Sequence, residues 1–146
     1  MAVRLGGAAR SEQTLDVMYY LFNSDLTGLL VIDALLQAAD RGVRVRLLLD
    51  DVLTRGYDRG LIALDTHPNI EIRMFNPWAR RFMRSLNMLF DFGRLNRRMH
   101  NKAFIMDNQA AVIGGRNIGN EYFAADESVN FGDLDTLVLG PIVDEV

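Results

Sequence analysis

The sequence contains no cysteine, and no apolar run approaches the roughly 18 residues that a membrane-spanning helix needs. The first absence excludes disulfide bonds and thiolate metal sites, and it leaves the redox compartment undetermined. The opening stretch MAVRLGGAAR lacks the long apolar region of a signal peptide, so we interpret it as a remnant of a longer chain or an added leader. The 146 residues are 49% hydrophobic, enough for one domain, residues 1–146, with a sizeable core.

The chain also lacks a strong charge of one sign, because its formal net charge is -3. Positive charge is nevertheless concentrated in residues 78–102, which hold seven Arg or Lys residues and one Asp. A basic segment on an acidic body favours an anionic partner such as phosphate, nucleic acid or a lipid headgroup. Scattered arginines on a solvated loop are the simpler interpretation, and charge alone does not decide between the two.

Residues 14–50 predict a strand, a helix and a second strand joined by short loops. Alternating apolar residues and β-formers predict strands over 14–22 and 43–50. Gly42 is placed to end the intervening helix as its C′ residue. The candidate N-caps of this helix are Asn23, Ser24 and Asp25, and the apolar residues on one predicted face are Leu29, Ile32, Leu36 and Ala39. Such a unit is right-handed and pairs its strands in parallel.

The rest of the chain predicts shorter elements around a variable insert. We expect a helix over 58–65, strands over 70–75, 99–107, 110–115 and 133–140, and a basic amphipathic insert or packed loop over 77–98. The two strands on either side of Asn108 and Gln109 predict a hairpin. The fold class is therefore α/β, with a mixed, mostly parallel β-sheet flanked by helices.

His100 and Lys102 are two residues apart in a predicted strand, so their side chains share one face. Two cations there would repel each other unless an anion lay over them or the imidazole were neutral. A neutral imidazole beside an ammonium can attack phosphorus while the ammonium neutralises the phosphoryl oxygens. Taken singly, the simpler interpretation is a packed histidine and a solvated lysine.

The end of the second hairpin strand adds a possible phosphate pocket. Gly114 and Gly115 allow the backbone to approach a ligand closely. Asn117 can donate an amide N–H to an anionic oxygen. Lys102, Asn117 and local backbone N–H groups could together hold a phosphate.

The stretch HNKAFIMDNQAAVIGGRN, residues 100–117, resembles the HKD signature of the phospholipase D superfamily. Residues 15–51 and the stretch IRMFNP resemble bacterial cardiolipin synthases, and RMHNKAFIMDNQAAVIGGRNIGNEYF is most similar to the first HKD motif of their C type. Many relatives have Ser where this chain has Gly115, so a hydroxyl contact to phosphate is lost here. The resemblance implies a phospholipase D-like half-domain that needs no metal and no cofactor.

The resemblance also implies residue roles. His100 is the candidate nucleophile that forms a phosphohistidine, and Lys102, Gly115 and Asn117 are the candidate phosphate site. Asp107 belongs to the motif, but its odd offset from Lys102 indicates that it ties the hairpin. Asp133 is the expected carboxylate partner of the histidine, with Asp135 and Glu121 as alternatives. Asp50 and Asp51 end a predicted parallel strand, where functional sites often gather, but the simpler interpretation is that they are turn or capping residues. We interpret His67 as a solvent-facing turn residue.

A phosphohistidine mechanism needs a second proton-transfer group, and this sequence has one HKD motif. In the superfamily two motifs meet, so the resemblance implies either the N-terminal half of a two-motif chain or one subunit of a homodimer. The implied activity is phosphatidyl transfer of the cardiolipin synthase type on phospholipids, at the bacterial inner membrane as a peripheral protein, or in the cytoplasm. The alternatives are a homodimeric nuclease of the same superfamily, and a fragment that is inactive alone.

Overall fold

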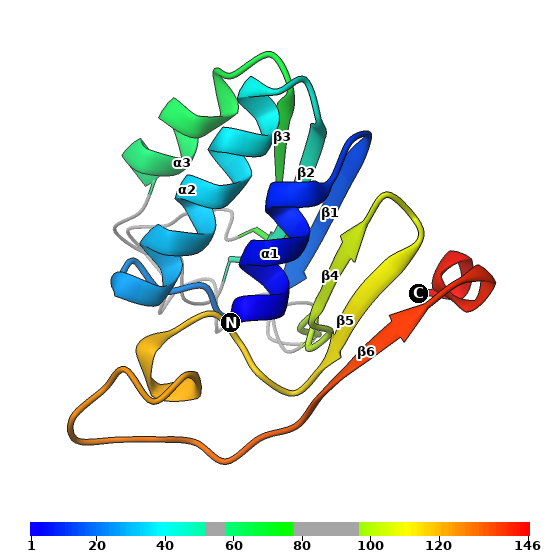
Figure 1. The fold of residues 1–146 in the computed structure, drawn as a ribbon. Helices are drawn as coiled ribbons and strands as arrows, with labels where there is room; N and C mark the ends of the chain where they lie inside the picture. The colour runs from blue at the N-terminus through cyan, green and yellow to red at the C-terminus, as the bar shows by residue number, and fades with distance from the viewer. Residues whose placement is uncertain (52–57, 78–96) are drawn as a thin grey trace.

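A computed structural model describes residues 1–51, 58–77 and 97–146. The chain forms a six-stranded sheet with the strand order β3-β2-β1-β4-β5-β6. The helices α1 (Ala2–Arg10), α2 (Leu26–Asp40) and α3 (Asp58–Asp65) all lie against one face of this sheet (Figure 1). No helix in the described ranges is long and apolar enough to cross a bilayer. The predicted insert 77–98 falls almost wholly outside the described residues.

The first half of the sheet is the predicted parallel unit. Strands β1 (Thr14–Tyr19), β2 (Arg44–Asp50) and β3 (Ile70–Phe75) pair in parallel, and α2 connects the first two. Asp25 caps α2 by accepting a hydrogen bond from the Gly28 N–H (3.0 Å), and Gly42 ends the helix with φ 96°. The predicted bounds of α3 and β3 are confirmed.

The second half of the sheet is antiparallel. Strands β4 (Ala103–Met106) and β5 (Ala110–Gly114) form the predicted hairpin, and β6 (Asp135–Leu139) pairs with β5. β4 also pairs antiparallel with β1, so two of the five strand pairings are parallel. The mixed sheet is confirmed, but the expectation that it is mostly parallel is wrong, because the hairpin and β6 supply half of its strands and three of its five pairings are antiparallel.

The core lies between the sheet and the helices. Alternate residues of β1 and β2 are buried on this side, and the largest of them are Leu15, Tyr19, Leu47 and Leu49. From α2, Val31, Leu35 and Ala38 pack against them. The predicted apolar face of α2 is therefore shifted, since Leu29 is 59% exposed while Thr27 and Gly28 are buried.

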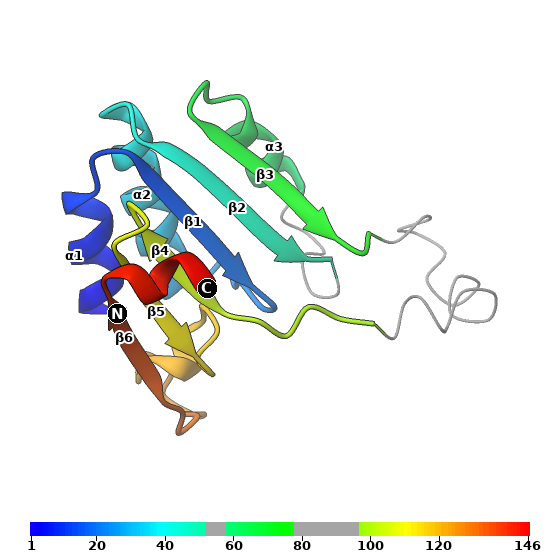
Figure 2. The ribbon, with the colours of Figure 1, turned by 90° about the vertical axis from the view of Figure 1, so that its right-hand side faces the viewer.

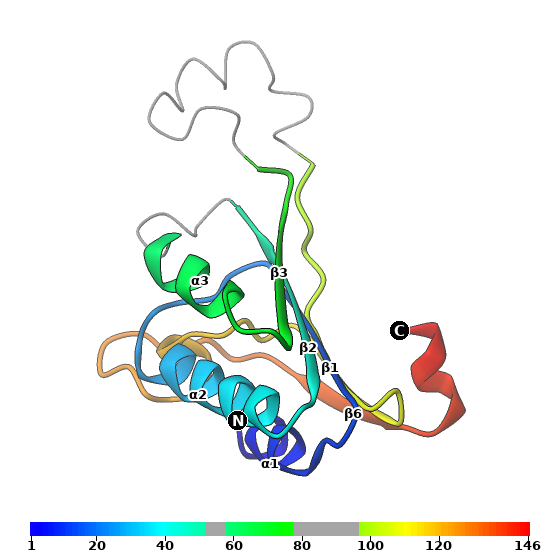
Figure 3. The same cartoon turned by 90° about the horizontal axis from the view of Figure 1, so that it is seen from above.

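The opposite face of the sheet carries no helix in the described ranges except the short η2 (Pro141–Glu145), which lies on the side of β5 and β6 (Figures 2 and 3). Val143 of η2 is buried there. Two ion pairs, Arg46 with Asp16 and Arg73 with Glu71, cross the rest of this face. Polar pairs over an apolar floor therefore form the uncovered side of the sheet.

Candidate active site

The candidate site lies at one edge of the sheet. The carboxyl ends of β1, β2 and β3 meet there, and residues 97–102 run along the same edge before β4 begins (Figure 2). The expected strand over 99–107 is too long, because β1 pairs with β4 only from Ala103 onward. His100 and Lys102 thus precede the strand, and His100 is exposed whereas Lys102 is only 6% exposed.

His100 and Lys102 nevertheless meet. The Lys102 Nζ lies 3.1 Å from His100 Nδ1 and donates a hydrogen bond to the His100 carbonyl oxygen at 2.7 Å. An ammonium group can only donate, so Nδ1 accepts and the neutral ring carries its proton on Nε2. The lysine therefore fixes both the backbone and the tautomer of the histidine in this arrangement.

Tyr20 completes this cluster, and the sequence analysis missed it. Its ring lies against the His100 ring, with centroids 4.9 Å apart at 49°, and the Lys102 Nζ lies 5.8 Å from its centroid. A cation at that distance from an aromatic face is attracted to it. The alternation of β1 contains the signal, since Tyr20 follows Met18 on the side of the strand away from Tyr19.

The environment of Lys102 favours loss of its proton. Burial lowers the pKa of Lys102, and the negative charge of Asp133 partly offsets this by raising the pKa. The net pKa lies below the ordinary 10.5. A buried ammonium with few fixed counter-charges is a favourable place for an anionic ligand.

Asn117 lies beside this cluster but its side chain is largely committed to protein contacts. Its Oδ1 accepts a hydrogen bond from the Leu21 N–H (3.0 Å), and its Nδ2 donates to the Tyr122 hydroxyl (3.0 Å). An amide nitrogen has two N–H groups, so one remains for a ligand. Because Leu21 follows Tyr20, this amide connects the segment after β5 to the segment after β1 that carries the Tyr20 ring.

The three candidate carboxylate partners of the histidine differ in the hydrogen bonds that they already accept. Asp135 accepts hydrogen bonds from Arg4 (3.0 Å) and the Arg116 N–H (3.3 Å), and Glu121 accepts one from Asn23 (3.1 Å). Asp133 is exposed, and within the described residues its carboxylate accepts a hydrogen bond from the adjacent Leu134 N–H alone (2.8 Å). Asp133 therefore has the freest carboxylate, although it makes no hydrogen bond with His100 among the described residues.

Gly115 lies directly against Asp133. A Cβ atom at position 115 would clash with the Asp133 carboxylate. The glycine therefore leaves space for this carboxylate at the end of β5. A serine at this position would compete with the carboxylate for the same space.

Asp107 lies at the other end of β4 from the site. Five residues of extended chain separate it from Lys102, about 17 Å at the usual rise. Its carboxylate accepts hydrogen bonds from three consecutive backbone N–H groups, those of Glu12, Gln13 and Thr14 (2.9, 2.8 and 2.8 Å). Burial acts to raise the pKa of Asp107, but these hydrogen bonds outweigh it and hold the pKa below its usual value. Asp107 thus ties the hairpin turn to the residues before β1.

The interpretation of Asp50 as a turn or capping residue is wrong, because Asp50 is the last residue of β2, whereas Asp51 is the turn residue that follows. Both are fully buried at the carboxyl end of β2. Asp50 accepts hydrogen bonds from the Met99 N–H (3.0 Å) and from Arg98 Nη1 (3.1 Å). The sequence signal for this burial is the apolar run Leu47–Leu49 directly before them. His67 is half-buried, and its Nε2 lies 3.2 Å from Asp40 rather than in open solvent.

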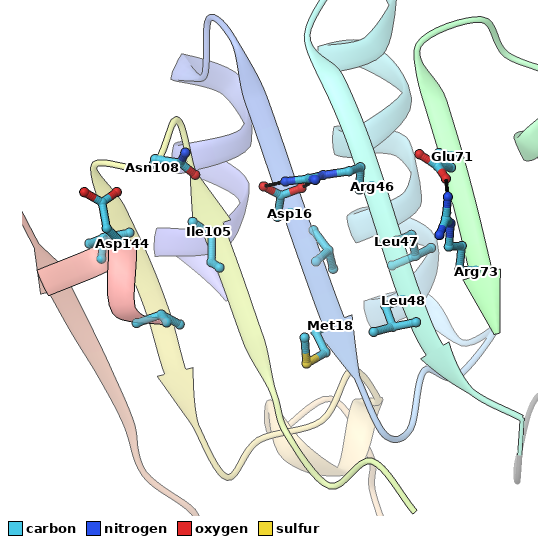
Figure 4. A pocket seen from close by; sticks show the side chains of 13 residues that line it. Asp16, Met18, Arg46, Leu47, Leu48, Glu71, Arg73, Ile105, Asn108 and Asp144 are labelled. Atoms are coloured by element: carbon cyan, nitrogen blue, oxygen red, sulfur yellow. Dashed lines mark hydrogen bonds and ion pairs between the residues drawn. The ribbon is translucent and has the colours of Figure 1, made fainter. Parts of the chain in front are cut away.

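A hollow of about 510 Å³ lies over the uncovered face of the sheet, away from this cluster. Met18, Leu48 and Ile105 form its floor, and the pair Arg46–Asp16 lies at its side (Figure 4). None of the predicted site residues lines it. In the parts of the chain that the structure describes, no three His, Asp or Glu side chains converge as metal ligands would.

Comparisons with known proteins show the family and the fold of this chain. Residues 7–137 match the family model described as "Cardiolipin synthase, PLD-like domain". The chain is 53% identical to cardiolipin synthase C of Escherichia coli over 145 residues, which is 99% of this chain and 31% of that protein. The chain thus spans about a third of the length of this relative.

Solved structures share the fold at low sequence identity. Phosphatidylserine synthase from Haemophilus influenzae superposes with a TM-score of 0.67 at 15% identity, covering 97% of this chain and 31% of that one. Nuc, a phospholipase D family member from Salmonella typhimurium, gives 0.59 at 20% identity, covering 94% of this chain and 73% of that one. The match to the family model covers most of the chain, and the chain therefore belongs to the cardiolipin synthase family of phospholipase D-like domains.

Proposed function

We propose that this chain supplies one half of the active site of a phosphatidyltransferase of the cardiolipin synthase type. The observation that carries the proposal is the 3.1 Å contact between Lys102 Nζ and the ring of the exposed His100. The identity of 53% to cardiolipin synthase C supports the lipid substrate. The second half of the site would come from a second HKD motif, in the same chain or in a homodimer.

The reaction begins when a phospholipid phosphodiester displaces the imidazole as the partner of Lys102. An anionic phosphoryl oxygen attracts the ammonium more strongly than a neutral ring nitrogen does. Loss of the lysine contact releases Nδ1, and the ring can then take the tautomer whose Nε2 carries the lone pair. In that tautomer Nδ1 carries the proton, and Asp133 is the carboxylate available to accept a hydrogen bond from the Nδ1–H group.

Attack by His100 forms an N–P bond and breaks the P–O bond to the departing alcohol. The alcohol oxygen takes a proton from a group of the second half. The hydroxyl of a second phospholipid then attacks phosphorus, its proton passes back to that group, and the N–P bond breaks. Lys102 and the free N–H of Asn117 stabilise the negative charge that builds up on the phosphoryl oxygens.

The substrates indicate where the protein works. The positive charge of residues 78–102 is attracted to anionic lipid headgroups at about 1 kcal/mol for each basic residue near the surface. We therefore place the protein at the bacterial inner membrane as a peripheral enzyme.

A nitrophenyl leaving group tests the proposal on this chain alone, because nitrophenolate departs without a proton donor. Vesicles that carry a p-nitrophenyl ester of phosphatidic acid should give a burst of nitrophenolate, and His100→Ala should give none. The same ester of thymidine 5′-phosphate is the nucleic acid comparison. A larger burst with the nucleotide ester would favour assignment of the chain as a nuclease rather than a lipid transferase. An unchanged burst in His100→Ala would show that His100 is not the nucleophile.

A further inference from the structure

Asp50 is a fully buried carboxylate at the edge where the candidate site lies. Burying an ionised carboxylate is costly unless hydrogen bonds and a counter-charge compensate it. Asp50 has both, since it accepts from the Met99 N–H (3.0 Å) and pairs with Arg98, whose side chain is 14% exposed (3.1 Å). Both partners come directly before His100 in the chain.

The neighbouring strand end adds two further bonds to the same segment. Arg98 Nη1 also donates to the Asn76 carbonyl oxygen (3.4 Å), and the Asn76 side chain donates to the Arg97 carbonyl oxygen (2.8 Å). The ends of β2 and β3 therefore hold residues 97–99 at three consecutive positions.

These anchors matter because the sheet does not hold this segment. Strand pairing to β1 begins only at Ala103, so ladder hydrogen bonds do not fix His100. The backbone around the exposed histidine is held on one side by Asp50, through Met99, and on the other by Lys102, through the His100 carbonyl oxygen. A nucleophile must be held to within about half an ångström of its productive position.

We propose that Asp50, with Arg98 as its counter-charge, is the positioning residue that holds the His100 ring against Tyr20 and Lys102. Asp50 touches no reacting atom and acts through the Met99 N–H. The proposal rests on the role of His100 in the proposed function, but the position of the ring can be measured without turnover.

The test follows the His100 ring protons by NMR. The chain has two histidines, so His67 is an internal reference, and His100→Ala assigns the signals. The Tyr20 ring 4.9 Å away shifts the His100 signals by its ring current. In Asp50→Asn, residues 97–99 lose the carboxylate oxygen that accepts from either Met99 or Arg98. The His100 signals should then lose most of the ring-current shift, whereas the His67 signals should not move. Leu35→Ala, a core substitution in α2, controls for general destabilisation, because it lowers the melting temperature without touching residues 97–100.

Two results would overturn the proposal. One is a folded Asp50→Asn protein with unchanged His100 signals, and the other is an equal change in Leu35→Ala. If Asp50→Asn does not fold, Arg98→Gln replaces it and the same outcomes decide. In the nitrophenyl assay, Asp50→Asn should slow the burst about 10- to 100-fold with an unchanged KM. A wild-type protein without any burst would contradict the proposed function, whereas the NMR result would still decide the role of Asp50.

Discussion

Lys102 is the only lysine of the chain, and it is buried beside the exposed His100. The sequence spacing correctly predicted that these two residues lie together, but the structure shows a different geometric reason. The sequence predicted two side chains on one strand face, whereas the lysine reaches back from the start of β4 to the histidine backbone and ring. The alternation of β1 places Tyr20 on the side away from Tyr19, but it could not show that the Tyr20 ring lies against His100, because that contact joins residues 80 positions apart.

Lys102 should titrate below 10.5, since burial disfavours its charged form more than Asp133 favours it. Between the folded pKa and 10.5 the unfolded state binds more protons, so this residue makes stability rise with pH. Urea denaturation should show that rise in the wild type relative to Lys102→Met. Carbon-13 labelling of lysine reports the pKa without ambiguity. A midpoint at or above 10.5 would contradict the burial of this ammonium.

Asp133→Asn should lower the pKa of Lys102 further, because it removes the one charge that raises it. The same lysine label measures this shift. Asp144→Asn is a matched control, since Asp144 is exposed on η2 and does not contribute to the Lys102 pKa. An equal Lys102 pKa in Asp133→Asn and the wild type would show that the Asp133 carboxylate does not act on Lys102.

Among the three α-helices of the described residues, α1 is the one that the sequence did not predict. Its two glycines and short apolar stretch favour a leader or a loop, yet Gly7 allows the helix to approach Met106 closely. Arg4 of α1 donates to the Tyr19 hydroxyl (2.8 Å) and to Asp135 (3.0 Å). A buried arginine seldom reveals itself in sequence, because its partners are far along the chain. The strands and the hairpin were predictable because their alternation and turn residues are local signals.

Arg4→Met should therefore destabilise the protein by undocking α1 from β1 and β6. Removing one partner of a buried ion pair costs about 3–5 kcal/mol, and Arg116 at 3.5 Å from Asp135 should keep the loss near the lower end. Urea denaturation gives the free energy of unfolding. Arg10→Met at the exposed end of the same helix is the control, and an equal, small effect of both variants would show that Arg4 does not anchor α1.

At the scale of the whole molecule, the described chain forms a sheet with helices on one face and a one-motif site at its edge. The sequence could predict the α/β class and the HKD cluster from short-range patterns. The alternation of β1 and β2 is that of a half-solvated sheet and is the local signal for the uncovered face, but the placement of all three helices on the other face depends on long-range packing that short-range patterns do not contain. In the proposed mechanism the site supplies a nucleophile and a cation, and the proton donor comes from a second half.

The central claim is that His100 becomes covalently phosphorylated. Mass spectrometry of the chain, quenched in alkali after reaction with the p-nitrophenyl phosphatidyl ester, tests it most directly. Trypsin releases residues 99–102, so an adduct on His100 lies in a peptide with one nucleophilic side chain besides Lys102. We expect a phosphatidyl group on His100, reduced occupancy in Lys102→Met and none in His100→Ala. An unmodified His100, or an adduct on another residue, would contradict it.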